Sequence, residues 1–247
     1  MIKAIGNIGK YLILLKKAFG RPERYSVYYS QTIREIEKHG IGSILIVVIV
    51  SLFVGAAITI QTNYNIQNPL LPAYLVGVAV RDSLLLEFSS TMIGLVLAGK
   101  IGSSIVSEIG MMKVTEQIDA LEVMGINAPG YLLLPKIIAT VLFTPLLCVL
   151  SVGIGILGGY FVCLIGDVVS VSDFISGIQY EFFPHYLPYA MIKTAFYAFI
   201  IASVSGYFGF NVKGGAVEVG RSSTKAVVLN CILILLADLT LTNIILQ

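Results

Sequence analysis

Long apolar runs divide the chain into segments that could cross a membrane. Four runs contain at most one charged residue, and they cover residues 41–60, 137–166, 194–212 and 226–246. A helix needs about 20 mainly apolar residues to cross the hydrocarbon core of a bilayer, so each run suits one crossing. A fifth candidate, residues 73–99, carries Arg81, Asp82 and Glu87 and has the least regular pattern. The pattern therefore predicts an all-α integral membrane protein with about five transmembrane helices.

The first forty residues have a different pattern, in which apolar positions recur at helical spacing among basic ones. The apolar stripe consists of Ile2, Ile5, Ile8, Leu12, Leu15 and Phe19. This pattern is typical of an amphipathic helix that lies in the headgroup plane of a membrane; a soluble helix that packs on a partner is the alternative. Pro22 interrupts the pattern before a second amphipathic stretch. We expect an interfacial helical region at residues 1–40 and a transmembrane domain at residues 41–247.

Composition narrows the class of protein further. Hydrophobic residues make up 57% of the 247 residues and charged residues only 12%, whereas an average soluble domain has about 25% charged residues. A soluble globular enzyme and a disordered chain are therefore excluded. The net charge of +2 gives no reason to expect a nucleic-acid partner. Cys148, Cys163 and Cys231 lie in apolar runs without CxxC spacing, so we expect buried apolar side chains.

The distribution of Lys and Arg predicts how the chain is oriented. Eight of the sixteen lie within residues 1–40, whereas residues 61–80 and 167–192 contain none. Cytoplasmic loops carry an excess of these residues. We therefore expect the N-terminus in the cytoplasm and, after five crossings, the C-terminus on the periplasmic side. No signal peptide is expected, because the first long apolar run begins late and lacks a small-residue cleavage site.

Residues 94–101 look like a phosphate-binding loop, but the match fails. The sequence GLVLAGKI ends in Ile101, where Ser or Thr should bind magnesium, and it ends an apolar helix instead of following a strand. We therefore expect no ATP hydrolysis by this chain alone. His39 and His185 fall on opposite sides of the membrane in this topology, so they cannot share a site. No catalytic residue, cofactor or metal ligand is expected.

Three charged residues fall within or beside apolar segments: Glu87, Lys100 and Asp238. Placing a charged side chain within the bilayer costs free energy, so a charged residue found there is expected to have a function. Glu87 and Lys100 are about 20 Å apart along one helix, so they cannot pair with each other there. Each needs a partner on a neighbouring helix or a passing lipid headgroup. We expect a structural neighbour for Asp238 and positions near a substrate path for Glu87 and Lys100.

A short amphipathic helix is predicted at residues 115–124, on the Lys-rich side. Val114, Ile118 and Leu121 form an apolar stripe beside an acidic one, and Gly125 can end the helix with a left-handed residue. The segment is too short and too charged to cross a bilayer. Such a helix in the cytoplasm, between two spans, needs a partner for its apolar stripe.

The block around this helix resembles the signature region of the MlaE/YrbE permease family, the membrane subunits of Mce-type ABC transporters. The resemblance rests on four short sequence motifs: GKIGS at 99–103, EIGMM at 108–112, TEQI at 115–118 and LEVM at 121–124. The family usually has Arg in the first of these motifs, where this chain has Lys100. Lys is less able than Arg to make forked contacts with phosphate oxygens. In outline the likeness covers nearly the whole chain.

The resemblance implies a homodimeric ABC permease in the bacterial inner membrane that carries phospholipid or a related lipid between inner and outer membranes. It also implies an ABC ATPase subunit docked on a coupling helix at residues 115–124, and an Mce-domain lipid-binding protein on the far side. The residues expected to take part in ATPase coupling are Glu108, Thr115, Glu116, Ile118, Asp119, Leu121 and Glu122.

Two other classes of function are alternatives. A self-sufficient secondary transporter or channel predicts two repeated halves with interrupted helices, and the sequence has no such repeat. A lipid-modifying membrane enzyme needs His, Asp or Glu clustered at one interface, and the two separated histidines argue against it. Co-purification of an ATPase favours the permease, whereas transport by the lone chain favours the secondary transporter.

Overall fold

The computed structural model describes residues 2–20, 25–66, 71–166 and 168–246, and every regular element within these ranges is helical. The α-helices are α1 (Ile2–Ala18), α2 (Tyr25–Glu35), α3 (Ile44–Asn65), α4 (Leu75–Ser83), α5 (Ser89–Leu97), α6 (Ser103–Val114), α7 (Gln117–Val123), α8 (Ala128–Gly166), α9 (Val171–Gln179), α10 (Tyr186–Phe210) and α11 (Ala216–Leu246). Short turns of wider or tighter helix join some of them without a loop. These are the π-helical turns Ile36–Gly40, Leu84–Phe88 and Ala98–Gly102 and the 3-10 turn Ile41–Ser43. The predicted all-α class is confirmed.

Five helices in the described part of the chain are long and apolar enough to cross a membrane, as the sequence predicts. They are Tyr28–Asn65, Leu75–Val114, Ala128–Gly166, Tyr186–Phe210 and Ala216–Ile244. The first three contain 38, 40 and 39 residues. At 1.5 Å per residue these three are about 60 Å long, or about twice the hydrocarbon thickness of a bilayer. They therefore extend well beyond the membrane interior.

Several span boundaries differ from the sequence prediction: the first, third and fifth spans begin at Tyr28, Ala128 and Ala216, earlier than predicted, and the first therefore begins within residues 1–40, the region predicted to be interfacial. Two further differences involve charged residues. The apolar pattern ends the second span at Gly99, but that helix continues to Val114 through the turn Ala98–Gly102. The pattern begins the fourth span after Lys193, but α10 begins at Tyr186 and contains this lysine. Both differences have one cause: a charged residue ends a charge-free run, yet it continues a helix when a neighbouring segment satisfies the charge.

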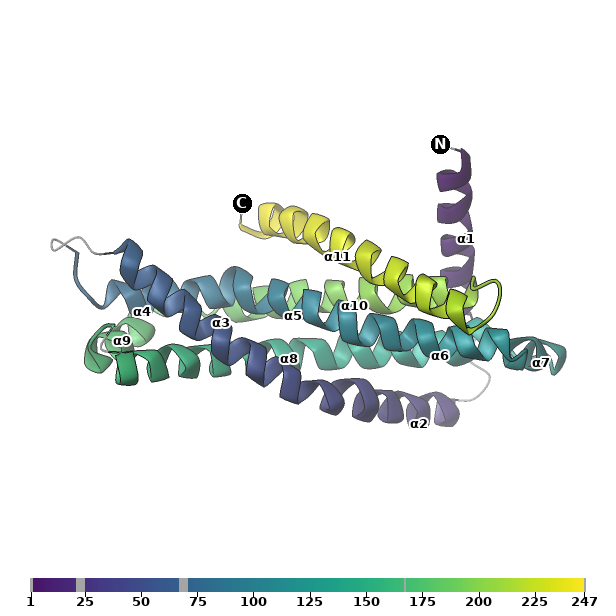
Figure 1. Cartoon of the computed structure of the whole chain (residues 1–247), viewed down its shortest axis with the longest axis horizontal. Coiled ribbons are helices and arrows are strands. Elements are labelled where there is room, and N and C mark those ends of the chain that lie inside the picture. The colour runs from purple at the N-terminus through teal and green to yellow at the C-terminus, as the bar shows by residue number, and fades with distance from the viewer. Residues whose placement is uncertain (1, 21–24, 67–70, 167, 247) are drawn as a thin grey trace.

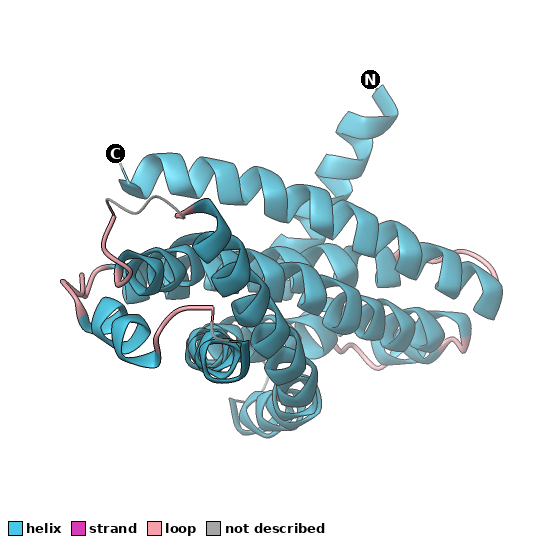
Figure 2. Cartoon of the chain, turned by 60° about the vertical axis from the view of Figure 1, so that its left-hand side comes forward, coloured by secondary structure: helices cyan, strands magenta, loops and turns pink. Residues whose placement is uncertain are grey.

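The long helices lie side by side along the long axis of the molecule, with α7 at one end and α9 at the other (Figure 1). The view turned by 60° shows the same bundle, with the N-terminal helix projecting from it (Figure 2). Helix α1 runs across the bundle axis, with Ile8 and Leu12 exposed on it and Phe19 exposed directly after it. This direction is consistent with a helix that lies in the membrane plane while the bundle crosses the bilayer.

Helices α3 and α8 pack closely because glycines face the backbone of the opposite helix. A Cβ atom placed on Gly55 of α3 would lie 1.9 Å from the carbonyl oxygen of Gly155 on α8. A Cβ atom on Gly158 would lie 2.1 Å from the carbonyl oxygen of Leu52. Small residues allow this close approach of transmembrane helices. The first and third spans therefore form one tightly packed unit.

Candidate functional site

A buried lysine joins three of the long helices in the membrane-spanning part of the bundle. Lys193 of α10 has no exposed surface. Its Nζ atom lies 3.0 Å from Oε2 of Glu87 and 2.6 Å from Oδ1 of Asp238. Glu87 belongs to the π-helical turn Leu84–Phe88, and Asp238 belongs to α11. Turns of this kind are frequent at functional sites. We call these three residues the charge triad.

Neutral side chains complete the hydrogen bonding of the charge triad. The hydroxyl of Thr242 donates to Oε1 of Glu87 at 3.0 Å and accepts a bond of the same length from the lysine. Tyr197 donates to Oδ1 of Asp238 at 2.5 Å, and Thr91 donates to its other oxygen at 3.2 Å. Buried charges require such pairing and hydrogen bonding to be tolerated. The network therefore fixes two carboxylates around a single ammonium group.

A cavity of about 180 Å³ lies beside the charge triad. Its lining residues are Glu87, Phe88, Thr91, Met92, Leu95 and Asp238. The Glu87 side chain is 41% exposed and the Asp238 side chain 17%, whereas the Lys193 side chain has no exposed surface. The cavity therefore presents carboxylate oxygens and apolar side chains together, and the lysine lies behind them. Such a wall can accept hydrogen bonds from a headgroup while it contacts hydrocarbon.

The three charges expected within the membrane have different surroundings. Asp238 contacts neighbouring helices, and it also lines the cavity beside Glu87. Lys100 does not share that cavity. Its ammonium group donates instead to the backbone carbonyl of Gly42, just before α3. The structure therefore places Lys100 outside the cavity beside Glu87, and its position near a substrate path stays a prediction.

Sequence reasoning missed Lys193, the centre of the charge triad. The charge-free run of residues 194–212 places it at a span boundary, where lysines are common. A detectable signal lies on its N-terminal side, where residues 186–192 are uncharged and mostly apolar. A window centred on the lysine therefore shows a charge inside a helix of membrane-spanning length.

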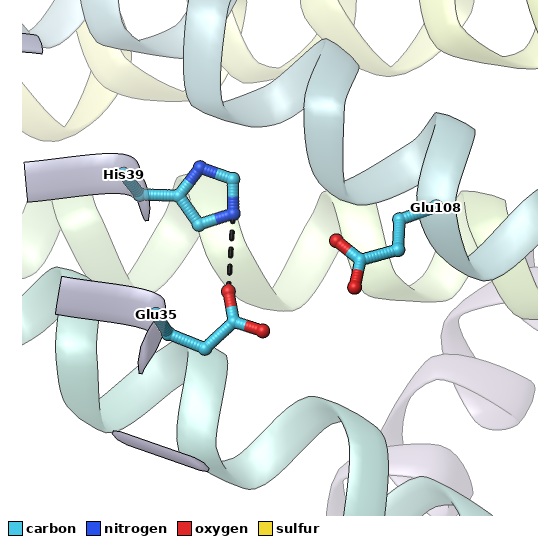
Figure 3. Close-up of side chains that lie close together, drawn as sticks. All are labelled: Glu35, His39 and Glu108. Carbon is cyan, nitrogen blue, oxygen red and sulfur yellow. Dashed lines mark ion pairs between the residues drawn. The ribbon is translucent and has the colours of Figure 1, made fainter. Parts of the chain in front are cut away.

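A second polar cluster lies at the α7 end of the bundle, where α2, α6 and α8 meet. Lys136 of α8 is buried, with Nζ 2.5 Å from Oε1 of Glu35 and 3.0 Å from Oε2 of Glu108. Lys38 pairs with the same Glu108 oxygen at 2.5 Å. Figure 3 shows Glu35, His39 and Glu108 converging, with Nε2 of the buried histidine 3.1 Å from Oε2 of Glu35. The network links three segments that are distant in sequence.

The donor atoms of Glu35, His39 and Glu108 lie within 4.8 Å of one another, a spacing that suits a metal ion. Lys136, however, already places its ammonium group against both carboxylates. A metal ion would have to displace this lysine, which is itself almost wholly buried. We therefore assign the cluster as an ion-pair network, in which lysine supplies the positive charge.

The residues expected to couple the chain to an ATPase surround α7. Thr115 caps α6 by donating to the carbonyl of Met111 at 2.8 Å, and Asp119 pairs with Lys113 at 2.5 Å. Glu116 and Glu122 are exposed. Glu116 has a left-handed backbone (φ 58°) that separates α6 from α7, and Gly125 (φ 80°) follows the end of α7. The left-handed glycine agrees with the sequence prediction, and the helix begins at Gln117.

The apolar stripe of this short helix faces the permease bundle and is not open to a partner. Ile118 is buried in the main apolar core, and Leu121 packs against the same core. The expectation that the stripe awaits a partner is therefore wrong, because the chain covers it. The exposed apolar surface lies at the tip instead, where Val123 is 88% and Met124 66% exposed.

The fold and the charge triad define a multi-pass membrane protein with a cavity between its helices that carboxylates and apolar side chains line together. The chain belongs to the MlaE permease family: the family model described as "Permease MlaE" matches residues 32–244. It is 32% identical to a probable ABC transporter permease protein of Rickettsia bellii, over 98% of this chain and 93% of that protein.

Two further relatives carry more specific names. The chain is 28% identical to the intermembrane phospholipid transport system permease protein MlaE of Haemophilus influenzae, over 98% of this chain and 92% of that protein. It is 31% identical to the chloroplastic protein TRIGALACTOSYLDIACYLGLYCEROL 1 of Arabidopsis thaliana, over 90% of this chain and 63% of that protein. The similarity therefore extends across bacterial and chloroplast proteins.

Proposed function

We propose that this chain is the membrane permease subunit of an ABC transporter that moves phospholipid or a related lipid between the inner and outer membranes. Membership of the MlaE permease family and the name of the Haemophilus relative support this function. The main structural support for this function is the cavity beside the charge triad, because its wall combines carboxylates with apolar side chains. An amphiphile is the class of molecule that such a wall fits.

The proposed role of the cavity follows from its electrostatics. Glu87 and Asp238 reach the cavity, while their shared cation Lys193 is buried behind them. Headgroup hydroxyl or ammonium groups can therefore donate to Glu87, while acyl chains contact Phe88 and Met92. The lysine holds both carboxylates in place between lipid passages. Glu87 thus supplies a charged hydrogen-bond acceptor on a path that is lined mainly by apolar side chains.

The proposed complex contains further subunits. A separate ATPase supplies the energy and docks on the exposed tip of α7, where Val123 and Met124 project beside Glu116 and Glu122. A second copy of this chain completes the permease, and an Mce-domain lipid-binding protein receives or delivers lipid on the periplasmic side. The N-terminus lies in the cytoplasm, in keeping with the eight basic residues within residues 1–40.

Reconstitution of the purified complex between donor and acceptor vesicles tests this function. We expect transfer of a labelled phospholipid that requires both ATP and the ATPase subunit. The lone chain in the same vesicles should transfer none. ATP-independent transfer by the lone chain would favour the secondary transporter or channel and would overturn the proposal.

A further inference from the structure

A second and larger cavity, of about 340 Å³, opens at the α7 end of the bundle. Segments from α2, the turn Ile36–Gly40, α6 and α8 form its wall. Its lining residues are Gln31, Arg34, Glu35, Lys38, Glu108, Met112, Tyr131, Leu132, Pro135 and Lys136. Along the second span, Glu108 lies about 30 Å from Glu87, so this cavity is separate from the one beside the charge triad.

The charges around this cavity leave one cation without a partner. Lys136 pairs with Glu35 and Glu108, and Lys38 pairs with Glu108 as well. Arg34 is exposed and makes no ion pair or hydrogen bond within the described ranges. The three cations at the wall outnumber the two carboxylates, and the guanidinium group of Arg34 is the one that remains available to a ligand.

Neutral donors and an apolar wall accompany the free arginine. The amide of Gln31 and the hydroxyl of Tyr131 line the cavity, and neither side chain makes a hydrogen bond to another described residue. Met112, Leu132 and Pro135 supply apolar surface beside them. Guanidinium groups bind phosphate oxygens with two parallel hydrogen bonds. The cavity thus offers donors for a phosphate group next to surface for hydrocarbon.

The position of the cavity along the bundle points to the source of such a ligand. In the first span the charge-free run begins at Ile41, and in the third span it begins at Ile137, directly after Lys136. Arg34 lies about 10 Å along the helix from Ile41. The headgroup layer on each side of the hydrocarbon is about 5–8 Å thick. The cavity therefore extends from the hydrocarbon boundary, at Lys136, to just beyond the headgroup layer, at the backbone of Arg34. The long arginine side chain can reach back to the lipid headgroups from there.

We propose that this cavity binds the phosphate-bearing headgroup of a phospholipid from the leaflet at the α7 end. Arg34 binds the phosphate, Tyr131 and Gln31 donate to its remaining oxygens, and Leu132 and Pro135 contact the glycerol and the first carbons of the acyl chains. The inference goes beyond the proposed function, because binding here requires no transport and involves none of the charge triad.

Native mass spectrometry of the full-length chain in detergent, titrated with phosphatidylglycerol, tests the proposal. We expect one lipid to bind each chain more tightly than the rest. Arg34→Gln should weaken that binding about tenfold or more, because a charge-assisted pair is lost. Arg221→Gln is the matched control: it removes the same group from an arginine that is 68% exposed and paired with Glu218, outside the cavity. Its effect should be about twofold or less.

Three outcomes would overturn the proposal. An equal loss for Arg34→Gln and Arg221→Gln would mean that only general surface charge attracts the lipid. Displacement of the lipid by equimolar inorganic phosphate would assign the cavity to free phosphate. If Arg34→Gln fails to fold, Tyr131→Phe replaces it as the test, and unchanged lipid binding in that variant would also count against the proposal. None of these results bears on transport through the cavity beside the charge triad.

Discussion

At the scale of single residues, Lys193 organises the membrane-spanning part of the molecule. One ammonium group lies within 3.0 Å of carboxylates from two other helices. The ion pairs compensate the cost of burying the lysine completely and Asp238 partly, but only while all partners are present. Without the lysine, Glu87 and Asp238 would face each other as like charges in a poorly solvated region. The lysine therefore stabilises the contact between α10, α11 and the second span.

We predict that Lys193→Met destabilises the protein by up to about 3 kcal/mol, because it leaves the largely buried Asp238 without its cation, although Glu87 is partly exposed. Thermal unfolding of the purified chain in detergent measures this effect. The matched control, Lys213→Met, removes an exposed lysine and should change stability by about 0.5 kcal/mol or less. Adding Asp238→Asn to Lys193→Met should recover part of the loss. Equal stability of the two single variants would contradict the prediction.

Sequence alone could identify Glu87 and Asp238 but not their shared partner. A carboxylate inside an apolar run stands out because its cost is local. Lys193 and Lys100 lie at the ends of such runs, where a lysine ordinarily reaches water. Their actual surroundings depend on which helices pack together, and this is a non-local property. For the same reason, the ion pairs of Lys136 could not be predicted from its place before the third span.

At the scale of elements, close helix contact depends on glycines that face a neighbouring backbone. Gly55 and Gly158 each leave no room for a methyl group against the opposite helix. Gly153 also belongs to α8, but a Cβ atom there would meet nothing within 4 Å. The two kinds of glycine cannot be told apart from spacing alone. Position in the packed bundle decides which of them is required.

We predict that Gly55→Ala lowers stability by at least about 1–3 kcal/mol, because its Cβ would force α3 away from α8. Gly153→Ala is the matched control and should be neutral or slightly stabilising, since alanine favours the helix. Thermal unfolding in detergent and the yield of monodisperse protein measure both variants. A tolerated Gly55→Ala together with a damaging Gly153→Ala would contradict the packing described above.

The short helix α7 leads to a prediction about ATPase docking. Val123→Arg should abolish co-purification of the ATPase while it leaves the permease folded, because this side chain is 88% exposed. Leu121→Arg should instead lower the yield of folded permease, because Leu121 packs against the core. Pull-down and size-exclusion profiles of both variants measure the two effects. Unchanged ATPase binding by Val123→Arg would place the dock elsewhere.

The lengths of the helices show another limit of sequence reasoning. Apolar runs predicted the existence of five spans but not that the second continues from Leu75 to Val114. Three π-helical turns keep the first and second spans continuous, and they contain His39, Glu87 and Lys100. Each of these side chains bonds or pairs with another group. The periodicity of the sequence does not predict such turns, because contacts with other helices stabilise them.

At the scale of the whole molecule, the structure is a long bundle with an N-terminal helix across its axis (Figure 1). One cavity lies at the α7 end, and another lies beside the charge triad. The bundle is about twice as long as the hydrocarbon core. Its α7 end therefore extends beyond the membrane, where an ATPase can reach it. Orientation decides which compartment this end faces.

We predict that the N-terminal helix lies on the cytoplasmic side. Lys10 is exposed on α1, so a thiol introduced by Lys10→Cys should react with a membrane-impermeant reagent only after the inner membrane is opened. The native cysteines need replacement first, although Cys148 and Cys163 are buried. Labelling in intact spheroplasts would show that the chain has the opposite orientation in the membrane.

The most direct test of the central claim is lipid transfer by the reconstituted complex carrying Glu87→Gln. The variant retains both Lys193 and Asp238, which lie 2.6 Å apart in the native chain, so the bundle and its thermal stability should be largely retained. Removal of the charged acceptor should lower ATP-dependent transfer about tenfold, which is the effect of losing one charged hydrogen bond. Glu37→Gln, at an exposed position outside both cavities, should transfer lipid normally. Normal transfer by Glu87→Gln, accompanied only by lower stability, would remove Glu87 from the lipid path and contradict the account.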